Sequence, residues 1–505
     1  MSSDTLVRDL TTALEAVPLI DPHSHVDPLK PVARSLDDIL GYHYYTELAH
    51  SAGMSQGPLA KEIAPRDRVR AIIRHMTRFD NTAQYAWFLD IARTFLGFDR
   101  AHITEADADP LFEAAERTFG QIDWEQQVIS RSNLERIFLT NEFDDPYVWS
   151  DARPAARPVT TPVTAPMTTG PMTAAPVTQV PTPAGPTVAA DSTRLAAPYD
   201  PAVYVPCLRT DALVFHLDKP DTRQRLAKVT GVEVGDAATL RQAVRKLFER
   251  FVVKGAKACA ISLPPDFAPS RLAEMEFDRA VQAVTRENMV ARAVQTGLHA
   301  GIHLARTLTG TLTGSATHAD PSSPHAAAAL GTFMALAENC REFGLPFDLM
   351  VGVNRRVYEA GVYQGQDLFD RRTSLIQYRD LFNAFPDVTF PISVLTSGQN
   401  QELVAYSWIF PNVVANGHWW YSNIPAYIRS DLTERLQAVP KTKLIGYYSD
   451  AYKLEFVLPK YRMYRRVLAG VLADEFVRPG AMTESEAVAL GTRLLRDNVR
   501  EVFKV

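Results

Sequence analysis

Two histidines separated by one residue follow the first apolar run of the chain, in Asp21-Pro-His23-Ser-His25. In an extended chain, residues i and i+2 point to the same side, so both imidazoles can face one point. Neutral imidazole nitrogens are ligands for divalent metals such as zinc. Such a pair occurs by chance in many proteins, but its position at the end of a predicted strand favours a metal site.

A carboxylate in the same situation, Asp450, follows the last apolar run. If the strands close into a barrel, the first and the last strand are neighbours, which brings Asp450 beside His23 and His25. Two imidazoles and one carboxylate leave coordination positions open, as a catalytic metal requires. The alternative is that Asp450 caps the helix that follows it, because Asp is a favoured N-cap residue. We rank the metal ligand above the cap.

The elements that must position these residues are short β-rich runs separated by helical patterns. Residues 236–252 and 330–343, for example, carry apolar side chains at three- and four-residue spacing, which predicts helices. Alternating strands and helices predict an α/β fold, a (β/α)8 TIM-like barrel, with a doubly wound open sheet as the weaker alternative. The eight predicted strands are 18–21, 136–140, 203–207, 256–262, 347–353, 388–395, 412–416 and 443–448.

Polar or ionisable residues follow each of these runs. In a (β/α)8 barrel the C-terminal strand ends form the active-site face, so this recurrence predicts a site there rather than residues that only serve solubility. The strand-end residues are His23 and His25, Thr140 and Asn141, Arg209, Ser262, Asn354 and Arg355, Thr396 and Ser397, His418, and Asp450.

The composition excludes several classes of protein. Of 505 residues, 46% are hydrophobic, so the chain can bury a large core, and a formal net charge of -5 gives no electrostatic reason to expect nucleic acid or an anionic membrane as partner. No run approaches the ~18 apolar residues of a membrane-spanning helix. The first twenty residues lack the pattern of a signal peptide, and the three cysteines are few, odd in number and widely spaced. We therefore expect a cytoplasmic protein with reduced thiols.

One segment, residues 152–190, differs from the rest because it holds nine prolines with Thr, Ala and Val between them and no aromatic residue. Proline removes backbone donors from helices and sheets, so we expect a disordered Pro/Thr-rich insertion, and a recognition tract for a partner is the alternative. The expected organisation is a single metal-dependent barrel domain over 1–505, with a helical insertion at 27–129 and the disordered insertion at 152–190.

Several motifs together resemble the uronate isomerase (glucuronate isomerase) family of the amidohydrolase superfamily, which interconverts glucuronate or galacturonate with the matching ketouronate. The resemblance spans most of the chain apart from 152–190. It implies aldose–ketose isomerisation of a uronate or related sugar acid, one divalent metal ion (zinc, with manganese as the alternative), a helical insertion after the first strand, and a homo-oligomer. The motifs are Ile20-Asp-Pro-His-Ser-His25, Gly41-Tyr-His-Tyr44, Thr140-Asn-Glu-Phe-Asp-Asp-Pro146, Leu345-Pro-Phe-Asp-Leu-Met-Val-Gly352, Asn416-Gly-His-Trp-Trp420, Gly446-Tyr-Tyr-Ser-Asp450 and Tyr461-Arg-Met-Tyr-Arg-Arg466.

The resemblance also implies roles for single residues. Asp450 or His43 would move a proton between C2 and C1 of the sugar, and Tyr44 would hydrogen-bond the developing oxyanion. Judged by composition alone, His43 and Tyr44 would be ordinary packing residues. The implied metal ligands are His23, His25 and Asp450, and the implied substrate-binding residues are Arg209, Arg355, His418, Trp419 and Tyr452.

Three positions depart from the family pattern. Met350 stands where the family has a histidine, Ser262 lies near where it has an Asp-His pair, and Tyr452 stands where it has an arginine. These departures raise the alternative of a metal-dependent hydrolase or carbon–carbon lyase on the same scaffold. A non-catalytic binding protein whose working part is the tract at 152–190 is a third hypothesis, and the predicted metal ligands count against it.

We predict that the tract at 152–190 is dispensable for folding. Its composition cannot supply a packed core, and lengthening a surface loop is unfavourable by only about 0.6 kcal/mol per doubling. Replacing it with a short Gly/Ser linker should leave the melting temperature nearly unchanged. A large decrease would mean that the tract packs on the barrel.

Overall fold

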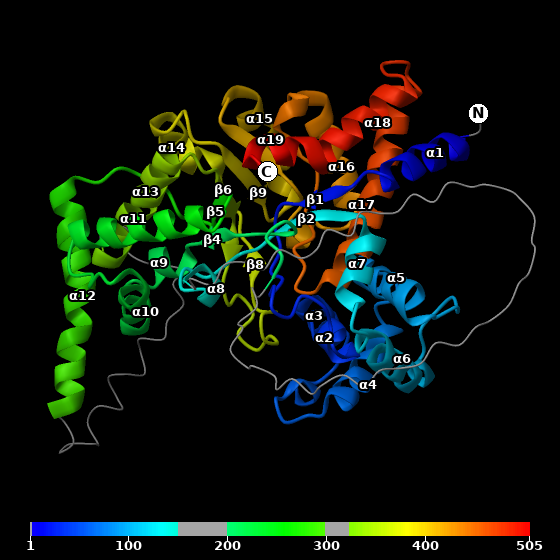
Figure 1. Ribbon diagram of the computed structural model, residues 1–505, viewed down its shortest axis with the longest axis horizontal. Helices are drawn as coiled ribbons and strands as arrows, with labels where there is room; N and C mark the ends of the chain where they lie inside the picture. The colour runs from blue at the N-terminus through cyan, green and yellow to red at the C-terminus, as the bar shows by residue number, and fades with distance from the viewer. Residues whose placement is uncertain (1–2, 150–198, 298–322) are drawn as a thin grey trace, which may run out of the picture.

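The computed structural model describes residues 3–149, 199–297 and 323–505 (Figure 1). The predicted disordered insertion at 152–190 lies outside the described residues. No helix in the described part of the chain is long and apolar enough to cross a membrane. All three cysteines are buried and free of disulfides.

The centre of the molecule is a parallel β-barrel (Figure 1). Every pairing between its neighbouring strands is parallel, in two runs of the order β1-β2-β3 and β11-β10-β9-β6-β5-β4. The predicted (β/α)8 barrel is therefore confirmed, and each predicted strand overlaps an observed one. The barrel strands are β1 (Leu19–Asp21), β2 (Leu134–Phe138), β3 (Tyr204–Val205) continued after Pro206 by β4 (Cys207–Arg209), β5 (Ala258–Leu263), β6 (Phe347–Val351), β9 (Phe390–Val394), β10 (Val413–Asn416) and β11 (Leu444–Ile445).

The first and last strands meet through the residues that follow β11. Ser449 donates its backbone N–H to Asp21 Oδ1 over 2.9 Å, and its hydroxyl contacts the other oxygen of the same carboxylate. Beyond that, the His25 N–H donates to Ala451 O over 2.8 Å, and the Asp450 N–H donates to His23 O over 3.2 Å. These bonds close the barrel at its C-terminal end.

The opposite end of the barrel is filled with apolar side chains. Ile20, Phe138 and Ile445 pack there with Val499 and Phe503 of the C-terminal helix. This helix, α19 (Asn498–Phe503), lies across the N-terminal ends of the strands. The polar strand ends therefore lie at the open face of the barrel, away from this plug.

Helices surround the barrel, as their apolar spacing predicts. In α11 (Ala237–Val253) the N-cap Asp236 accepts a hydrogen bond from the Thr239 N–H, and one face of the helix is buried. The predicted helix at 330–343 begins earlier, at Pro324, because Ser323 caps it and proline suits the first helical position. That helix is α13 (Pro324–Phe343). A short antiparallel ribbon, β7 (Val353–Asn354) and β8 (Leu368–Phe369), follows β6. The remaining helices outside the segment between β1 and β2 are α1 (Ser3–Glu15), α8 (Pro146–Trp149), α9 (Asp211–Phe215), α10 (Pro220–Thr230), α12 (Glu274–Gly297), α14 (Arg379–Ala384), α15 (Asn400–Ile409), α16 (Pro425–Ala438), α17 (Val457–Leu472) and α18 (Glu484–Thr492).

The segment between β1 and β2 is helical and lies on one side of the barrel (Figure 1). Glu455, which follows the last strand, ties this segment to the barrel: its Oε1 accepts from the Ala33 N–H over 2.9 Å and from Trp124 Nε1 over 2.7 Å. The helices of the segment are α2 (Leu36–Leu40), α3 (His43–Ser51), α4 (Pro65–Met76), α5 (Ala83–Leu96), α6 (Ala108–Phe119) and α7 (Trp124–Ser132).

We predict that Glu455 makes the stability of the fold depend on pH. Burial raises the pKa of the Glu455 carboxyl from 4.5 to about 7, although the hydrogen bonds from Trp124 and Ala33 oppose the shift. Because the folded state then binds more protons than the unfolded state between these two values, the Glu455 contribution to stability falls as pH rises from about 4.5 to about 7.

The variant Glu455→Gln keeps the oxygen that accepts both bonds and cannot ionise. The free energy of unfolding of the variant relative to the wild type should increase by up to about 3 kcal/mol between about pH 5 and about pH 8. Urea unfolding at several pH values measures this difference. The exposed Glu359→Gln is the control, and a pH-independent difference for Glu455→Gln would contradict the prediction.

Candidate metal centre and active site

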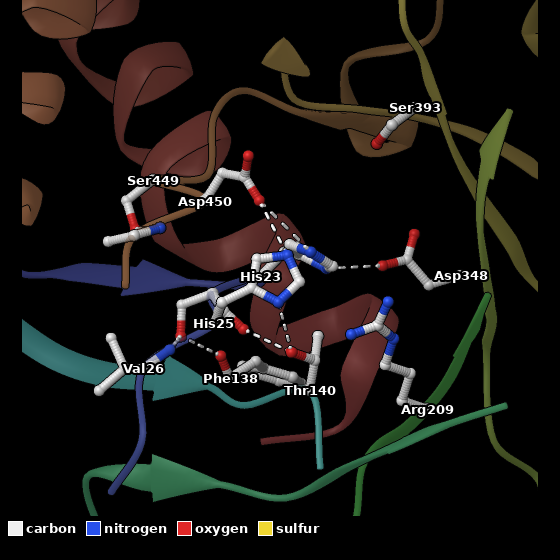
Figure 2. Close-up of polar contacts among 12 residues, drawn as sticks. His23, His25, Val26, Phe138, Thr140, Arg209, Asp348, Ser393, Ser449 and Asp450 are labelled. Carbon is white, nitrogen blue, oxygen red and sulfur yellow. Dashed lines mark hydrogen bonds and ion pairs between the residues drawn. The ribbon is translucent and has the colours of Figure 1, made fainter. Parts of the chain in front are cut away.

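The structure brings His23, His25 and Asp450 together at the open face of the barrel (Figure 2). One ligand atom from each residue lies within 4.8 Å of the other two. Asp450 Oδ1 is 3.3 Å from His25 Nε2 and 3.7 Å from His23 Nε2. The distance along the chain is bridged by the contact between β1 and the residues after β11, as barrel closure predicts.

The atoms that converge here fit a divalent metal ion. His23 Nε2 and Asp450 Oδ1 are buried, and neither has a hydrogen-bond partner among the described residues. An unsatisfied buried polar atom is unfavourable by about 1–3 kcal/mol, so a ligand for both atoms would remove that penalty. Two imidazole nitrogens and one carboxylate oxygen are a donor set typical of zinc and other divalent transition metals.

The tautomer of His25 is set by Thr140. The Thr140 hydroxyl donates to Ser24 O over 3.0 Å and lies 2.9 Å from His25 Nδ1. Because the hydroxyl has only one proton, it must accept a hydrogen bond from His25, whose Nδ1 therefore carries the proton. The lone pair of His25 is then on Nε2, the nitrogen that faces Asp450.

Asp450 sits in a left-handed turn, with a φ of 52°. A non-glycine residue in this conformation is stored strain that the surrounding structure must hold. Three hydrogen bonds hold it: Tyr42 OH donates to Asp450 O over 2.9 Å, Lys460 Nζ donates to Ser449 O over 2.7 Å, and the Asp450 N–H donates to the backbone oxygen of His23, two residues after β1. The carboxylate is thereby aimed at the two histidines.

The neighbours of Asp450 also set its charge. Burial raises the pKa of the Asp450 carboxyl, but the contact with His25 and the positive charges of His25, His23 and Lys460 lower it by more, so the net pKa lies well below its usual range. Burial lowers the pKa of His25, and the charge of Asp450 opposes only part of that effect. A carboxylate and a neutral imidazole are the protonation states that a metal requires.

Lys460 supplies positive charge from behind the site. It is fully buried in α17, and its ammonium lies 4.8–5.4 Å from the ring centroids of Tyr42, Tyr44 and Trp87. Burial lowers the pKa of Lys460 to about 8, although the charge of Asp450 opposes the shift. Rings of this kind stabilise a cation through their π faces.

His43 and Tyr44, at the start of α3, both reach the site. Tyr44 OH donates to Asp450 Oδ2 over 3.1 Å. His43 Nδ1 lies 2.5 Å from Glu47 Oε1 in the next turn of the helix, and its ring packs edge-on against Trp420 with the centroids 5.1 Å apart. The pair therefore lies beside the candidate metal site, with Tyr44 in direct contact with Asp450.

Two arginines and Tyr452 lie at the rim of the site. The Tyr452 ring is 4.9 Å from the His25 ring, and the positive charges of Arg209 and Arg355 both act on its hydroxyl. Arg209 pairs with Asp211 over 3.2 Å, Arg355 pairs with Asp367 over 2.5 Å, and both guanidinium groups keep further donors. Figure 2 shows Arg209 on the same side of the barrel as His25 and Thr140.

Comparison with known proteins bears on the fold. No protein-family model and no curated protein sequence matches the chain. Among solved structures, a glucuronate isomerase from Caulobacter crescentus aligns with a TM-score of 0.77 at 16% identity, over 100% of this chain and 94% of that one. A uronate isomerase from Thermotoga maritima aligns with a TM-score of 0.74 at 17% identity, over 99% of this chain and 97% of that one. A uronate isomerase from Bacillus halodurans aligns with a TM-score of 0.69 at 18% identity, over 100% of this chain and 97% of that one. This chain has the uronate isomerase fold.

Within this fold, His418 is not part of the group formed by His23, His25 and Asp450 in the described part of the chain. Strand β10 ends at Asn416, and Gly417, with a φ of 49°, redirects the chain. A Cβ at Gly417 would come within 2.2 Å of the Tyr448 ring, so only glycine fits this turn. In consequence His418 is buried against α16, with Nδ1 3.6 Å from Asp431 Oδ2, and burial lowers its pKa to about 4.

Trp420, the neighbour of the predicted Trp419, packs against the site. It adopts a φ of 41° and contacts both His43 and Tyr44. Trp419 is also buried, and among the described residues its ring makes no aromatic contact with the site. The sequence motif locates the pair of tryptophans but not which of them makes aromatic contacts with His43 and Tyr44.

Two of the three departures from the family pattern lie side by side. Ser262 of β5 and Met350 of β6 occupy paired positions in neighbouring strands. Met350 is buried and Ser262 half-buried. Within the described residues, the group of possible metal ligands contains neither of them. The fifth barrel strand therefore contributes no ligand of the kind that the family pattern implies.

Residues at the site that sequence analysis did not assign are Thr140, Tyr42, Asp348, Trp420 and Lys460. Thr140 was predicted only as a polar strand end. Asp348 and Lys460 stand inside apolar patterns, near the start of β6 and on the buried face of α17. A charged residue at a position that points into a core is the signal that could have identified both.

We predict that the wild type binds about one equivalent of a divalent metal through His23, His25 and Asp450. The double variant His23→Ala/His25→Ala should lose it, because it removes two of the three ligands. Metal analysis after dialysis measures the stoichiometry, with the exposed His102→Ala as control. Equal bound metal in the wild type and the double variant would refute the assignment.

Proposed function

We propose that this chain is a metal-dependent aldose–ketose isomerase of a uronate or a related sugar acid. One observation carries the proposal: His23, His25 and Asp450 converge at the open face of a barrel with the uronate isomerase fold, and Tyr44 donates to Asp450 there. Zinc is the expected metal and manganese the alternative. Assembly as a homo-oligomer and a cytoplasmic location remain predictions.

The metal would act at the substrate oxygens. Held by His23, His25 and Asp450, a divalent ion supplies Lewis acidity that polarises a carbonyl or hydroxyl oxygen of the substrate. The protein provides the geometry for this role, because the strained turn at Asp450 and the bond between Thr140 and His25 fix two of the ligands.

Isomerisation needs a base that removes a proton from C2 and a proton donor that delivers one to C1. The enediol forms when C2 loses its proton and O1 gains one, and it becomes the ketose when O2 loses its proton and C1 gains one. C1 is thereby reduced and C2 oxidised, so no external redox partner takes part. His43 and Asp450 are the two candidate bases. Asp450 Oδ1 faces the histidines and Oδ2 accepts from Tyr44, while the Nδ1 of His43 is taken up by Glu47.

The environment favours His43 as the base. The pKa of Asp450 is lowered by its positively charged neighbours, so this carboxylate binds a proton weakly. The carboxylate of Glu47 at Nδ1 orients the His43 ring and leaves Nε2 for the substrate, the arrangement of a base held by an orienting acid. Tyr44 is placed to donate to an oxygen that gains negative charge.

The rim would recognise the substrate carboxylate. The positive charges of Arg209 and Arg355 both act on the Tyr452 hydroxyl. A substrate carboxylate beside Tyr452 could therefore accept charge-assisted hydrogen bonds from both guanidinium groups. Tyr452 itself offers one neutral hydroxyl donor where the family pattern has an arginine, whose charged guanidinium can donate two parallel hydrogen bonds. This difference favours a modified sugar acid, or one bound in a different position, over plain glucuronate.

A metal-dependent hydrolase or carbon–carbon lyase is the second candidate. The observation that favours it is that Ser262 of β5 and Met350 of β6, which are paired in neighbouring strands, are both residues without an ionisable group. The same fold supports several chemistries, so the identity of the product decides between the two candidates.

We predict that the metal-loaded protein turns over a sugar acid but handles plain glucuronate poorly. The missing charged contact at Tyr452 corresponds to about 1.5–3 kcal/mol, or roughly a tenfold to hundredfold lower kcat/KM for a substrate that relies on it. NMR assays with glucuronate, galacturonate and modified sugar acids measure both the rate and the product. Glucuronate turnover at about 1–1000 per second would contradict the altered specificity.

The variant Tyr452→Arg should raise kcat/KM for glucuronate by at least about tenfold, because it restores the charge at that position. Tyr363→Arg adds the same charge at an exposed tyrosine near the rim and serves as the control. Hydrolysis of an amide or ester with no isomerisation of any sugar acid would instead support the second candidate.

A further inference from the structure

The imidazole of His23 lies between two carboxylates (Figure 2). Its Nε2 is 3.7 Å from Asp450 Oδ1, and its Nδ1 is 3.6 Å from Asp348 Oδ2. The side chains of His23 and Asp348 are each only 3% exposed. The ligand nitrogen and the other nitrogen of the same ring therefore each face a negative group, in a place that water hardly reaches.

Asp348 is itself held in one orientation. It is the second residue of β6, and its Oδ1 accepts a hydrogen bond from Asn416 Nδ2 of β10 over 3.1 Å. Asn416 is fully buried, and its backbone carbonyl oxygen accepts a hydrogen bond from Ser393 Oγ over 2.9 Å. Ser393 belongs to β9, the strand between β6 and β10. One carboxylate oxygen is thus bound to the barrel wall and the other faces His23.

The position of Asp348 selects the tautomer of His23. At 3.6 Å the contact is longer than a hydrogen bond, so it acts through charge. A negative oxygen beside Nδ1 repels a lone pair there and attracts an N–H, which leaves the lone pair on Nε2. Burial strengthens this effect, because water does not screen it. Thr140 achieves the same result at His25 with a hydrogen bond.

We propose that Asp348 is a positioning residue of the metal centre: its carboxylate, oriented by Asn416, holds His23 with the proton on Nδ1 and with Nε2 directed at the metal position. The inference rests on the metal centre of the proposed function and is independent of the substrate. Asp348 is not a ligand, since it faces the nitrogen opposite the one that binds.

The chain offers a matched control. His418 and Asp431 form a second buried pair in which Nδ1 and a carboxylate oxygen are also 3.6 Å apart, with exposed fractions of 0% and 2%. Asp431 belongs to α16, and within the described residues neither member of the pair is in the group of possible metal ligands. Asp431→Asn therefore removes a buried carboxylate from a histidine, as Asp348→Asn does, without touching the proposed metal centre.

The test measures zinc affinity in metal-depleted full-length protein by competition with a chelator. Asp348→Asn keeps the shape and an oxygen acceptor but removes the charge, and should weaken zinc binding about tenfold to hundredfold. Asp431→Asn should leave the affinity within about twofold. Asn416→Ala, which frees the carboxylate without removing it, should cause a smaller loss and provides a second variant if Asp348→Asn does not fold.

A second measurement reports on the tautomer. In the cobalt-substituted protein, the Nδ1–H protons of His23 and His25 should give two shifted, exchangeable NMR signals. Asp348→Asn should speed the solvent exchange of the His23 signal and leave the His25 signal unchanged, whereas a merely structural carboxylate would move neither. Unchanged zinc affinity and unchanged exchange in Asp348→Asn would overturn the proposal while the metal centre stands. Absence of zinc binding by the wild type would overturn both.

Discussion

Closure of the barrel between β1 and β11 is the interaction on which the site depends. Both strands are short, and the backbone ladder between them is replaced by the Asp21 carboxylate, which accepts from the backbone and the hydroxyl of Ser449. The carboxylate is fully buried, and burial raises its pKa to about 6 against the opposing effect of these bonds. The closure therefore requires a buried carboxylate at position 21, because an apolar side chain there could not accept the hydrogen bond from the Ser449 N–H. Because His23 and Asp450 follow within two residues on the two sides of this contact, the residues that close the fold also bring these two side chains together.

Along its axis the barrel interior changes from apolar to charged. The plug formed with Val499 and Phe503 is followed toward the open face by Asp348 and Asn416, and then by the two histidines and Asp450. Burial lowers the pKa of His23, but Asp348, Asp450 and Asp21 outweigh this effect and raise it. Three buried carboxylates around two imidazoles, with Lys460 as the nearby buried cation, leave a surplus of negative charge that a divalent cation would neutralise. The acidic interior and the apolar plug together explain why a metal would bind at one end of the barrel and not at the other.

The sequence predicts the eight strands and the meeting of His23, His25 and Asp450, because both follow from local apolar runs and from closure, which any (β/α)8 barrel shares. It does not predict the residues whose roles depend on tertiary packing. Asp348 stands within an apolar run, and only the pairing of β6 with β9, and of β9 with β10, places it beside Asn416 and His23. His418 follows a strand, as a site residue would, but the left-handed turn at Gly417 points it at α16 instead. The spacing of apolar residues in the sequence does not show where a single residue such as Gly417 changes the direction of the backbone.

The segment between β1 and β2 is part of the site because it holds Asp450, which follows the last strand. Tyr42 bonds the Asp450 carbonyl, Tyr44 bonds its carboxylate, and Trp87 completes the aromatic surroundings of Lys460. Lys460 in turn comes from α17, after the last strand, and binds Ser449. The strained turn at Asp450 is therefore held from both sides by segments that are far apart in sequence. A barrel without this segment would keep the histidine pair and the Lys460 contact but would lose both tyrosine contacts to Asp450, so the orientation of this carboxylate depends on the inserted segment as well as on the strands.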